Sequence, residues 1–93
     1  MVERVHREGT DKGDILVYAL STCVWCKKTK KFLEDQGIAY DYIFVDLLEE
    51  PDREEVVNEI KKWNPKCSFP TVLINNSTCI VGYNEDKILE VLE

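Results

Sequence analysis

The chain has 93 residues, of which 44% are hydrophobic and 32% charged, a composition typical of a single soluble globular domain. Its formal net charge of −6 argues against nucleic acid or an anionic membrane surface as a partner. No apolar run approaches the roughly 20 residues that span a bilayer, and the N-terminus lacks the hydrophobic core of a signal peptide. We therefore expect a cytoplasmic protein.

The first fourteen residues have a pattern of their own. Val2 to His6 alternate briefly between apolar and polar side chains, and a turn-forming stretch from Glu8 to Asp14 follows. We interpret residues 1–14 as an N-terminal arm or an added edge strand, and residues 15–93 as the main domain. His6, the only histidine, is expected to be a solvated residue of this segment rather than a catalytic base.

A buried strand followed by a helix comes next. Residues 15–20 are apolar on both pleat faces, as in a central strand that is covered on both sides. The following helix is expected to have Thr22 as its N-cap and Gly37 just past its C-terminus. Its buried face is predicted from helical spacing to contain Cys26, Thr29, Phe32 and Leu33.

The remaining pattern predicts three more strands and two more helices. A strand over 40–46 would run parallel to the first, because strand, helix and strand form a right-handed crossover unit. Pro51 opens a second helix, which Pro65 ends, and residues 67–74 and 78–82 predict a hairpin around an Asn-containing turn. Asn84 caps a last helix. The faces predicted to be buried are Val56, Val57, Ile60 and Trp63 in the second helix and Ile88, Leu89 and Leu92 in the last.

Two cysteines spaced by two residues lie where the first strand leads into the first helix. The stretch reads Ser21-Thr22-Cys23-Val24-Trp25-Cys26. Free backbone N–H groups and the helix dipole favour negative charge at such a position, and the thiolate is the form of cysteine that attacks disulfides. We predict that Cys23 is an exposed nucleophile and Cys26 an inward-facing resolving thiol, and that the two form a reversible disulfide with no bound cofactor.

The two other cysteines leave alternatives open. A zinc or iron–sulfur binding module is a competing hypothesis, although a four-thiolate zinc site usually has two close cysteine pairs, whereas eleven residues separate Cys67 from Cys79. Their places at different heights of the predicted hairpin also argue against a disulfide between them. Cys67, three residues before Pro70, is a candidate auxiliary thiol, and Cys79 is interpreted as a buried spectator.

The element order resembles the thioredoxin fold in its small glutaredoxin form over residues 15–93. The motifs that carry this resemblance are Thr22-Cys23-Val24-Trp25-Cys26, Phe69-Pro70-Thr71-Val72 and Gly82-Tyr83-Asn84-Glu85-Asp86. The resemblance implies an α/β fold with a four-stranded mixed sheet flanked by three helices, a cis bond before Pro70, and a thiol–disulfide oxidoreductase. The residues implied or expected to contact substrate are Thr22, Val24, Trp25, Phe69, Pro70, Thr71, Gly82 and Tyr83.

Within this superfamily the details are closer to the NrdH-redoxin type, the glutaredoxin-like electron donors of ribonucleotide reductase. Glutathione-binding glutaredoxins typically carry a lysine three residues before the first cysteine, where this chain has Leu20. That lysine would pair with a glutathione carboxylate. The leading hypothesis is therefore a monomer that reduces protein disulfides and is itself re-reduced by an upstream disulfide reductase. The alternative is a glutathione-dependent glutaredoxin.

Overall fold

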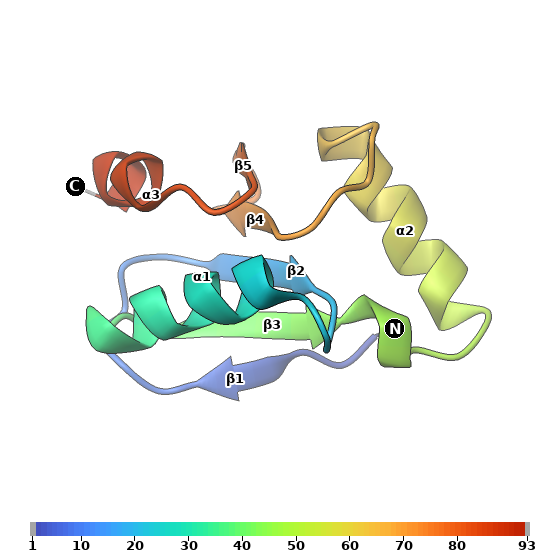
Figure 1. Ribbon diagram of the computed structural model, residues 1–93, viewed down its shortest axis with the longest axis horizontal. Coiled ribbons are helices and arrows are strands. Elements are labelled where there is room, and N and C mark those ends of the chain that lie inside the picture. The colour runs from blue at the N-terminus through green and yellow to red at the C-terminus, as the bar shows by residue number, and fades with distance from the viewer. Residues whose placement is uncertain (1, 93) are drawn as a thin grey trace.

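A five-stranded mixed sheet with the order β1-β3-β2-β4-β5 forms the centre of the protein (Figure 1). The computed structural model describes residues 2–92, so Met1 and Glu93, at the ends of the two predicted segments, lie outside the described residues. β2 and β3 are parallel, and the other neighbouring strands are antiparallel. The elements are β1 (Val5–Arg7), β2 (Ile15–Ala19), α1 (Val24–Asp35), β3 (Tyr40–Phe44), the short 3₁₀ helix η1 (Val45–Leu47), α2 (Asp52–Trp63), β4 (Thr71–Ile74), β5 (Thr78–Val81) and α3 (Glu85–Leu92).

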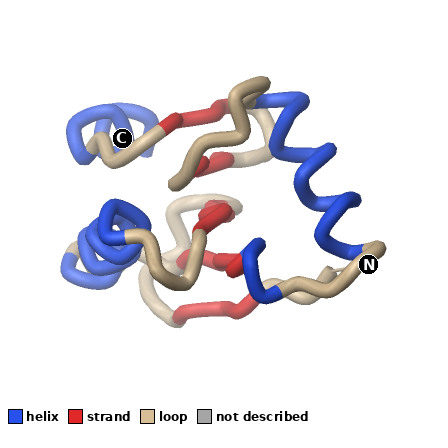
Figure 2. The backbone as a smooth tube through the Cα atoms, turned by 45° about the vertical axis from the view of Figure 1, so that its right-hand side comes forward, coloured by secondary structure: helices blue, strands red, loops and turns tan. Residues whose placement is uncertain are grey.

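The helices cover both faces of the sheet. Figure 2 shows α1 and α3 on one side of the strands and α2 on the other. All five residues of β2 are buried, as predicted for a central strand. Because successive side chains of a strand point to opposite faces, Val17 packs with α1 and α3 while Tyr18 packs with α2. The predicted thioredoxin-like α/β fold with its mixed sheet and three helices is confirmed.

The two ends of α1 differ in how well the sequence predicted them. Thr22 is wrong as the N-cap, because Cys23 takes that position with an extended backbone and its Sγ accepts a hydrogen bond from the Cys26 N–H at 3.2 Å. Gly37 follows the C-cap residue Gln36 with a φ of +68°, as predicted. The buried face of α1 is confirmed: it consists of Cys26, Thr29, Phe32 and Leu33.

The last helix corrects one predicted core residue. Asn84 caps α3, because its Oδ1 accepts a hydrogen bond from the Lys87 N–H at 3.0 Å. Leu89 is wrong as a core residue, since its side chain is 37% exposed. Ile88 is buried, and Val91 and Leu92 pack against the same cluster. These three residues lie at helical spacings of three and four, whereas Leu89 points about 100° away from Ile88.

Two predicted strands are shorter than expected. The strand predicted over 40–46 ends at Phe44, where the backbone turns into η1. The β-rich run predicted over 67–74 forms a strand only from Thr71, directly after Pro70, and Cys67 lies outside the strand with a φ of 51°, in the left-handed region. Its hairpin partner β5 and the positive φ values of Asn75 and Asn76 in the turn agree with the prediction.

The N-terminal residues form a strand, which was one of the two alternatives. β1 pairs antiparallel with β3, with His6 opposite Asp41. Further on, Thr10 exchanges backbone hydrogen bonds with Gly37 and Ala39 at 2.7 and 2.9 Å. Gly9 is needed at this crossing, because a Cβ there would lie 2.7 Å from the Ala39 nitrogen. The segment is therefore tied to the domain by backbone pairing at two places.

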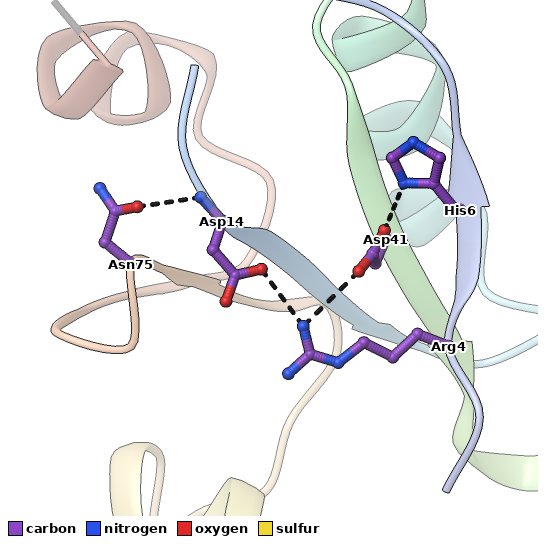
Figure 3. Close-up of polar contacts among 5 residues, drawn as sticks. All are labelled: Arg4, His6, Asp14, Asp41 and Asn75. Atoms are coloured by element: carbon purple, nitrogen blue, oxygen red, sulfur yellow. Dashed lines mark hydrogen bonds and ion pairs between the residues drawn. The ribbon is translucent and has the colours of Figure 1, made fainter. Parts of the chain in front are cut away.

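Polar side chains add to this attachment (Figure 3). The Arg4 guanidinium lies 3.2 Å from the Asp14 carboxylate and 3.5 Å from that of Asp41. His6 Nδ1 lies 2.7 Å from the other Asp41 oxygen, and the Asp14 N–H donates to the Asn75 Oδ1 at 2.9 Å. These contacts connect β1 with the beginnings of β2 and β3 and with the β4–β5 turn.

Candidate active site

The cysteine pair lies at the carboxyl end of β2, where the chain turns into α1. The Cys23 N–H donates to the Leu20 carbonyl at 3.2 Å, which closes a turn, and the Cys23 sulfur then caps the helix. Cys23 is partly exposed, whereas Cys26 is only 1% exposed. Both are free thiols. This agrees with the prediction of an outward thiol at the helix tip and an inward one a turn later.

The surroundings of Cys26 strongly disfavour its charged form. Burial raises the pKa of the Cys26 thiol to about 12, and the hydrogen bond with Cys23 and the nearby Cys23 and Asp46 charges act in the same direction. A backbone hydrogen bond with Leu20 opposes them. Cys26 is therefore protonated at neutral pH in the reduced protein, so the first attack on a disulfide falls to Cys23.

The loop before β4 is shaped by a side chain that the sequence analysis did not single out. Asn64 is buried at the end of α2, and its Nδ2 donates to the Ser68 carbonyl, the Ser68 Oγ and the Thr71 Oγ1 at 3.3, 3.0 and 3.2 Å. The Thr71 hydroxyl donates to the Ser68 carbonyl at 2.7 Å. Thr71 is thus fully buried and holds the loop, although it was predicted to contact substrate. The Phe69–Pro70 bond in this loop is cis, as the resemblance implied.

A surface hollow of about 300 Å³ collects most of the predicted substrate residues. The Gly82 N–H donates to the Pro70 carbonyl at 2.8 Å, which brings the start of α3 beside the proline loop. The Trp25 ring is stacked against Tyr83 with 5.9 Å between ring centroids, and the Lys28 ammonium lies 4.5 Å from the Trp25 centroid. The hollow is lined by Trp25, Phe69, Pro70, Gly82 and Tyr83.

The other predicted residues lie outside this hollow. Thr22 and Val24 are exposed on the active-site turn. Cys67 packs against the cluster on the α2 side of the sheet, whereas Cys23 packs against the cluster on the α1 side. The auxiliary role of Cys67 stays a prediction. Cys79, which was interpreted as a buried spectator, is only partly buried; it lies opposite Leu73 in the hairpin, and desolvation raises the pKa of its thiol.

Two further findings concern metals and membranes. Across residues 2–92, no three His, Cys, Asp or Glu side chains gather in a group able to hold a metal ion. Over the same residues, none of the helices combines the length and apolar character that a membrane crossing requires.

Comparison with known proteins agrees with the geometry of the site. The family profile described as glutaredoxin matches residues 15–79, which contain both cysteines and the proline loop.

The chain belongs to the glutaredoxin family.

Solved structures of this family are closely similar to the chain. The glutaredoxin from Methanosarcina mazei Go1 is 50% identical with a TM-score of 0.90, over 96% of this chain and 86% of that one. The methanoredoxin from Methanosarcina acetivorans is also 50% identical, with a TM-score of 0.87 over 90% of this chain and 88% of that one. A glutaredoxin-like 8.6 kDa protein in the rubredoxin operon of Clostridium pasteurianum is 30% identical, over 85% of this chain and 97% of its own length. As a member of this family the chain is a redox protein, and Cys23 and Cys26 are its neighbouring cysteine pair.

Proposed function

We propose that this glutaredoxin reduces disulfides in proteins by a dithiol mechanism. The observation that carries the proposal is the contrast within the cysteine pair: Cys23 is accessible at the start of α1, while Cys26 is buried and protonated one turn later. The two sulfurs have separate tasks in such a mechanism. Two cysteines with a purely structural role do not require that one thiol be accessible and the other be buried.

The reaction transfers two electrons from the thiol pair to the substrate. The Cys23 thiolate attacks one sulfur of the substrate disulfide, which forms a mixed disulfide and releases one substrate thiolate that takes a proton from water. Cys26 then loses its proton to water, and its thiolate attacks the Cys23 sulfur. The Cys23–Cys26 disulfide forms, and the second substrate thiolate leaves and is protonated in turn.

The hollow beside Trp25 supports a polypeptide as the substrate. Its walls are aromatic and apolar, and the stacked Trp25 and Tyr83 rings offer a flat surface for a side chain next to the reacting cysteine. The proline loop next to the hollow offers backbone groups to an extended chain, in the manner of strand addition. We expect preferred substrates to carry an apolar residue beside the disulfide.

The source of electrons is proposed to be a dedicated disulfide reductase. Leu20 adds no positive charge before the cysteine pair, so one of the charges that would attract a glutathione carboxylate is missing. Ribonucleotide reductase or a similar enzyme is a candidate acceptor of the electrons. A reducing compartment such as the cytoplasm would keep the dithiol in its working form.

Trapping of the mixed disulfide tests this function. In a Cys26→Ser variant, Cys23 still attacks but nothing resolves the product, so a covalent complex with a disulfide protein such as insulin should accumulate and disappear on addition of dithiothreitol. A Cys23→Ser variant should trap nothing, and Cys79→Ser, with both active cysteines in place, should turn over like the parent protein. Absence of a trapped species together with no insulin reduction by the parent protein would refute the proposal.

A further inference from the structure

A carboxylate outside the cysteine motif is bonded to the residue that begins it. The parallel ladder between β2 and β3 ends with Ala19 opposite Phe44. Continued by two residues on each strand, the same register places Ser21 opposite Asp46. At this position the Asp46 side chain takes the place of the backbone hydrogen bonds between the two strands. Its Oδ1 accepts a hydrogen bond from the Ser21 N–H at 2.9 Å, and its Oδ2 accepts one from the Ser21 hydroxyl at 2.5 Å.

The anchored residue belongs to the turn that presents the nucleophile. Ser21 lies inside the turn that the hydrogen bond from the Cys23 N–H to the Leu20 carbonyl closes. Cys23 follows two residues later and caps α1 with its sulfur. A shift of Ser21 away from η1 would therefore move the turn, the cap and the approach of the two sulfurs together.

The carboxylate is held in the charged form that makes these bonds strong. The hydrogen bond from the Ser21 hydroxyl, followed by that from the Ser21 N–H, lowers the pKa of Asp46 below its ordinary value, and the nearby Arg53 charge adds to this. Hydrogen bonds to an ionised acceptor are stronger than neutral ones. The anchor is therefore present throughout the neutral pH range.

We propose that Asp46 is a positioning residue of the redox centre, which fixes Ser21 and thereby holds Cys23 at the start of α1 within reach of Cys26. Asp46 acts through Ser21 and needs no contact with sulfur or substrate. The inference deepens the proposed function, on which its importance for activity depends, because a well-placed turn makes attack within the pair faster.

The anchoring role can be separated from a simple effect of charge. Asp46 is one of the nearby charges that disfavour a Cys26 thiolate, so removal of its charge could alter the site without any movement of the turn. Asp46→Asn removes the charge but keeps an oxygen for the Ser21 N–H and an amide donor for the Ser21 oxygen. Asp46→Ala removes both the charge and the anchor.

The decisive measurement is the rate at which reduced protein closes its Cys23–Cys26 disulfide after mixing with excess oxidised glutathione, which forms a mixed disulfide with Cys23 that Cys26 then resolves. We expect Asp46→Asn to stay within about twofold of the parent protein and Asp46→Ala to be slower by about three- to tenfold. Ser21→Ala, which keeps the N–H bond, should fall between them. The double variant Ser21→Ala with Asp46→Ala should be no slower than Asp46→Ala alone, because the two side chains act as one unit.

Glu49 supplies a matched control. It is an exposed carboxylate three residues after Asp46, and within residues 2–92 its side chain makes no hydrogen bond or ion pair. Glu49→Asn and Glu49→Ala should both close the disulfide at the parent rate. The inference is overturned if Asp46→Asn is as slow as Asp46→Ala, if all Asp46 variants match the parent, or if the Ser21 and Asp46 effects add.

The same series distinguishes this inference from the proposed function. Insulin reduction by the parent protein tests the function, whereas ring closure is measured on the pair itself and needs no protein substrate. A parent protein that closes its disulfide but reduces no protein would refute the function and leave the variant series to decide the inference. If Asp46→Ala does not fold, the contrast between Ser21→Ala and Asp46→Asn still decides it.

Discussion

Adjacent residues at the start of α1 have opposite surroundings. Trp25 is 53% exposed and lies against Tyr83, while Cys26, the next residue, is 1% exposed among core side chains. The cause is the turn of about 100° per residue in an α-helix, which sends neighbouring side chains in different directions. One short motif thus supplies both an exposed aromatic surface and a protected thiol.

At this scale, replacement of Trp25 should weaken substrate binding more than catalysis. Trp25→Ala removes an aromatic wall of the hollow, and because an aromatic contact with a substrate side chain is worth about 0.5–1.5 kcal/mol, the KM for insulin should rise about two- to tenfold with little change in kcat. Leu89→Ala, another exposed apolar residue away from the hollow, should leave both constants unchanged. Steady-state kinetics checks this. A fall in kcat at constant KM would contradict a binding role for Trp25.

Single residues were predictable where a local rule determines their role. The spacing of Cys23 and Cys26 and the buried face of α1 follow from helical periodicity alone. Thr71 and Asn64 could not be assigned correctly in this way, because their hydrogen bonds depend on how the chain folds back between α2 and β4. Whether a polar side chain faces substrate or the interior depends on hydrogen-bond partners several residues away in the chain, which the local hydrophobic pattern does not reveal.

The connection between α2 and β4 is the element that sets the shape of the proline loop. The Asn64 side chain makes three hydrogen bonds to Ser68 and Thr71, four and seven positions later in the chain. A fourth hydrogen bond runs from the Thr71 hydroxyl to the Ser68 carbonyl. The end of α2 before Pro65 was predicted, whereas the loop residues from Cys67 were expected to belong to the following strand. Cys67 lies outside β4 with a positive φ, and no residue type at that position indicates a left-handed backbone.

Removal of the Asn64 side chain should destabilise the protein measurably. Asn64→Ala leaves the buried Thr71 Oγ1 without its donor and removes the hydrogen bonds to Ser68, so we expect the free energy of unfolding to fall by about 1–3 kcal/mol. Urea denaturation measures this loss. Asn58→Ala, at an exposed position of α2, provides the comparison and should change stability by less than about 0.7 kcal/mol. Equal effects at the two positions would show that the Asn64 bonds contribute little.

Across the whole molecule, the N-terminal segment is part of the fold rather than a separate arm. β1 pairs with β3, Thr10 pairs with the chain after α1, and Arg4 and His6 reach carboxylates at the starts of β2 and β3. The alternation in residues 2–6 was too short to decide between a strand and an arm. The deciding partner, Tyr40 to Tyr42, lies more than thirty residues away in the sequence.

The attachment of this segment should depend on pH through His6. The hydrogen bond with Asp41, followed by the charges of Glu8 and Asp41, raises the pKa of His6 above its ordinary value, although partial desolvation opposes the shift. The folded state therefore binds the proton more tightly than the unfolded state. This stabilisation is complete below the unfolded pKa of about 6.5 and is lost as the pH rises through the higher folded value.

Unfolding of the parent protein and of His6→Gln from about pH 5 to about pH 9 measures this contribution. The difference in the free energy of unfolding should be largest at the acidic end and shrink toward the alkaline end. Hydrogen exchange of the β1 amides should report the same trend. A difference that stays constant with pH would mean that the charged form of His6 has no part in holding the strand.

The position of β1 also covers what would otherwise be an open edge of the sheet. By pairing with β3, β1 covers the outer hydrogen-bonding groups of a strand that contains Tyr40, Tyr42, Ile43 and Phe44. The edge that it leaves open is only three residues long and carries His6 and Arg7, a short charged border of the kind that discourages further strand addition. A protein that begins at residue 9 should therefore associate with itself as its concentration rises, visible in sedimentation velocity, while the full chain sediments as a smaller species.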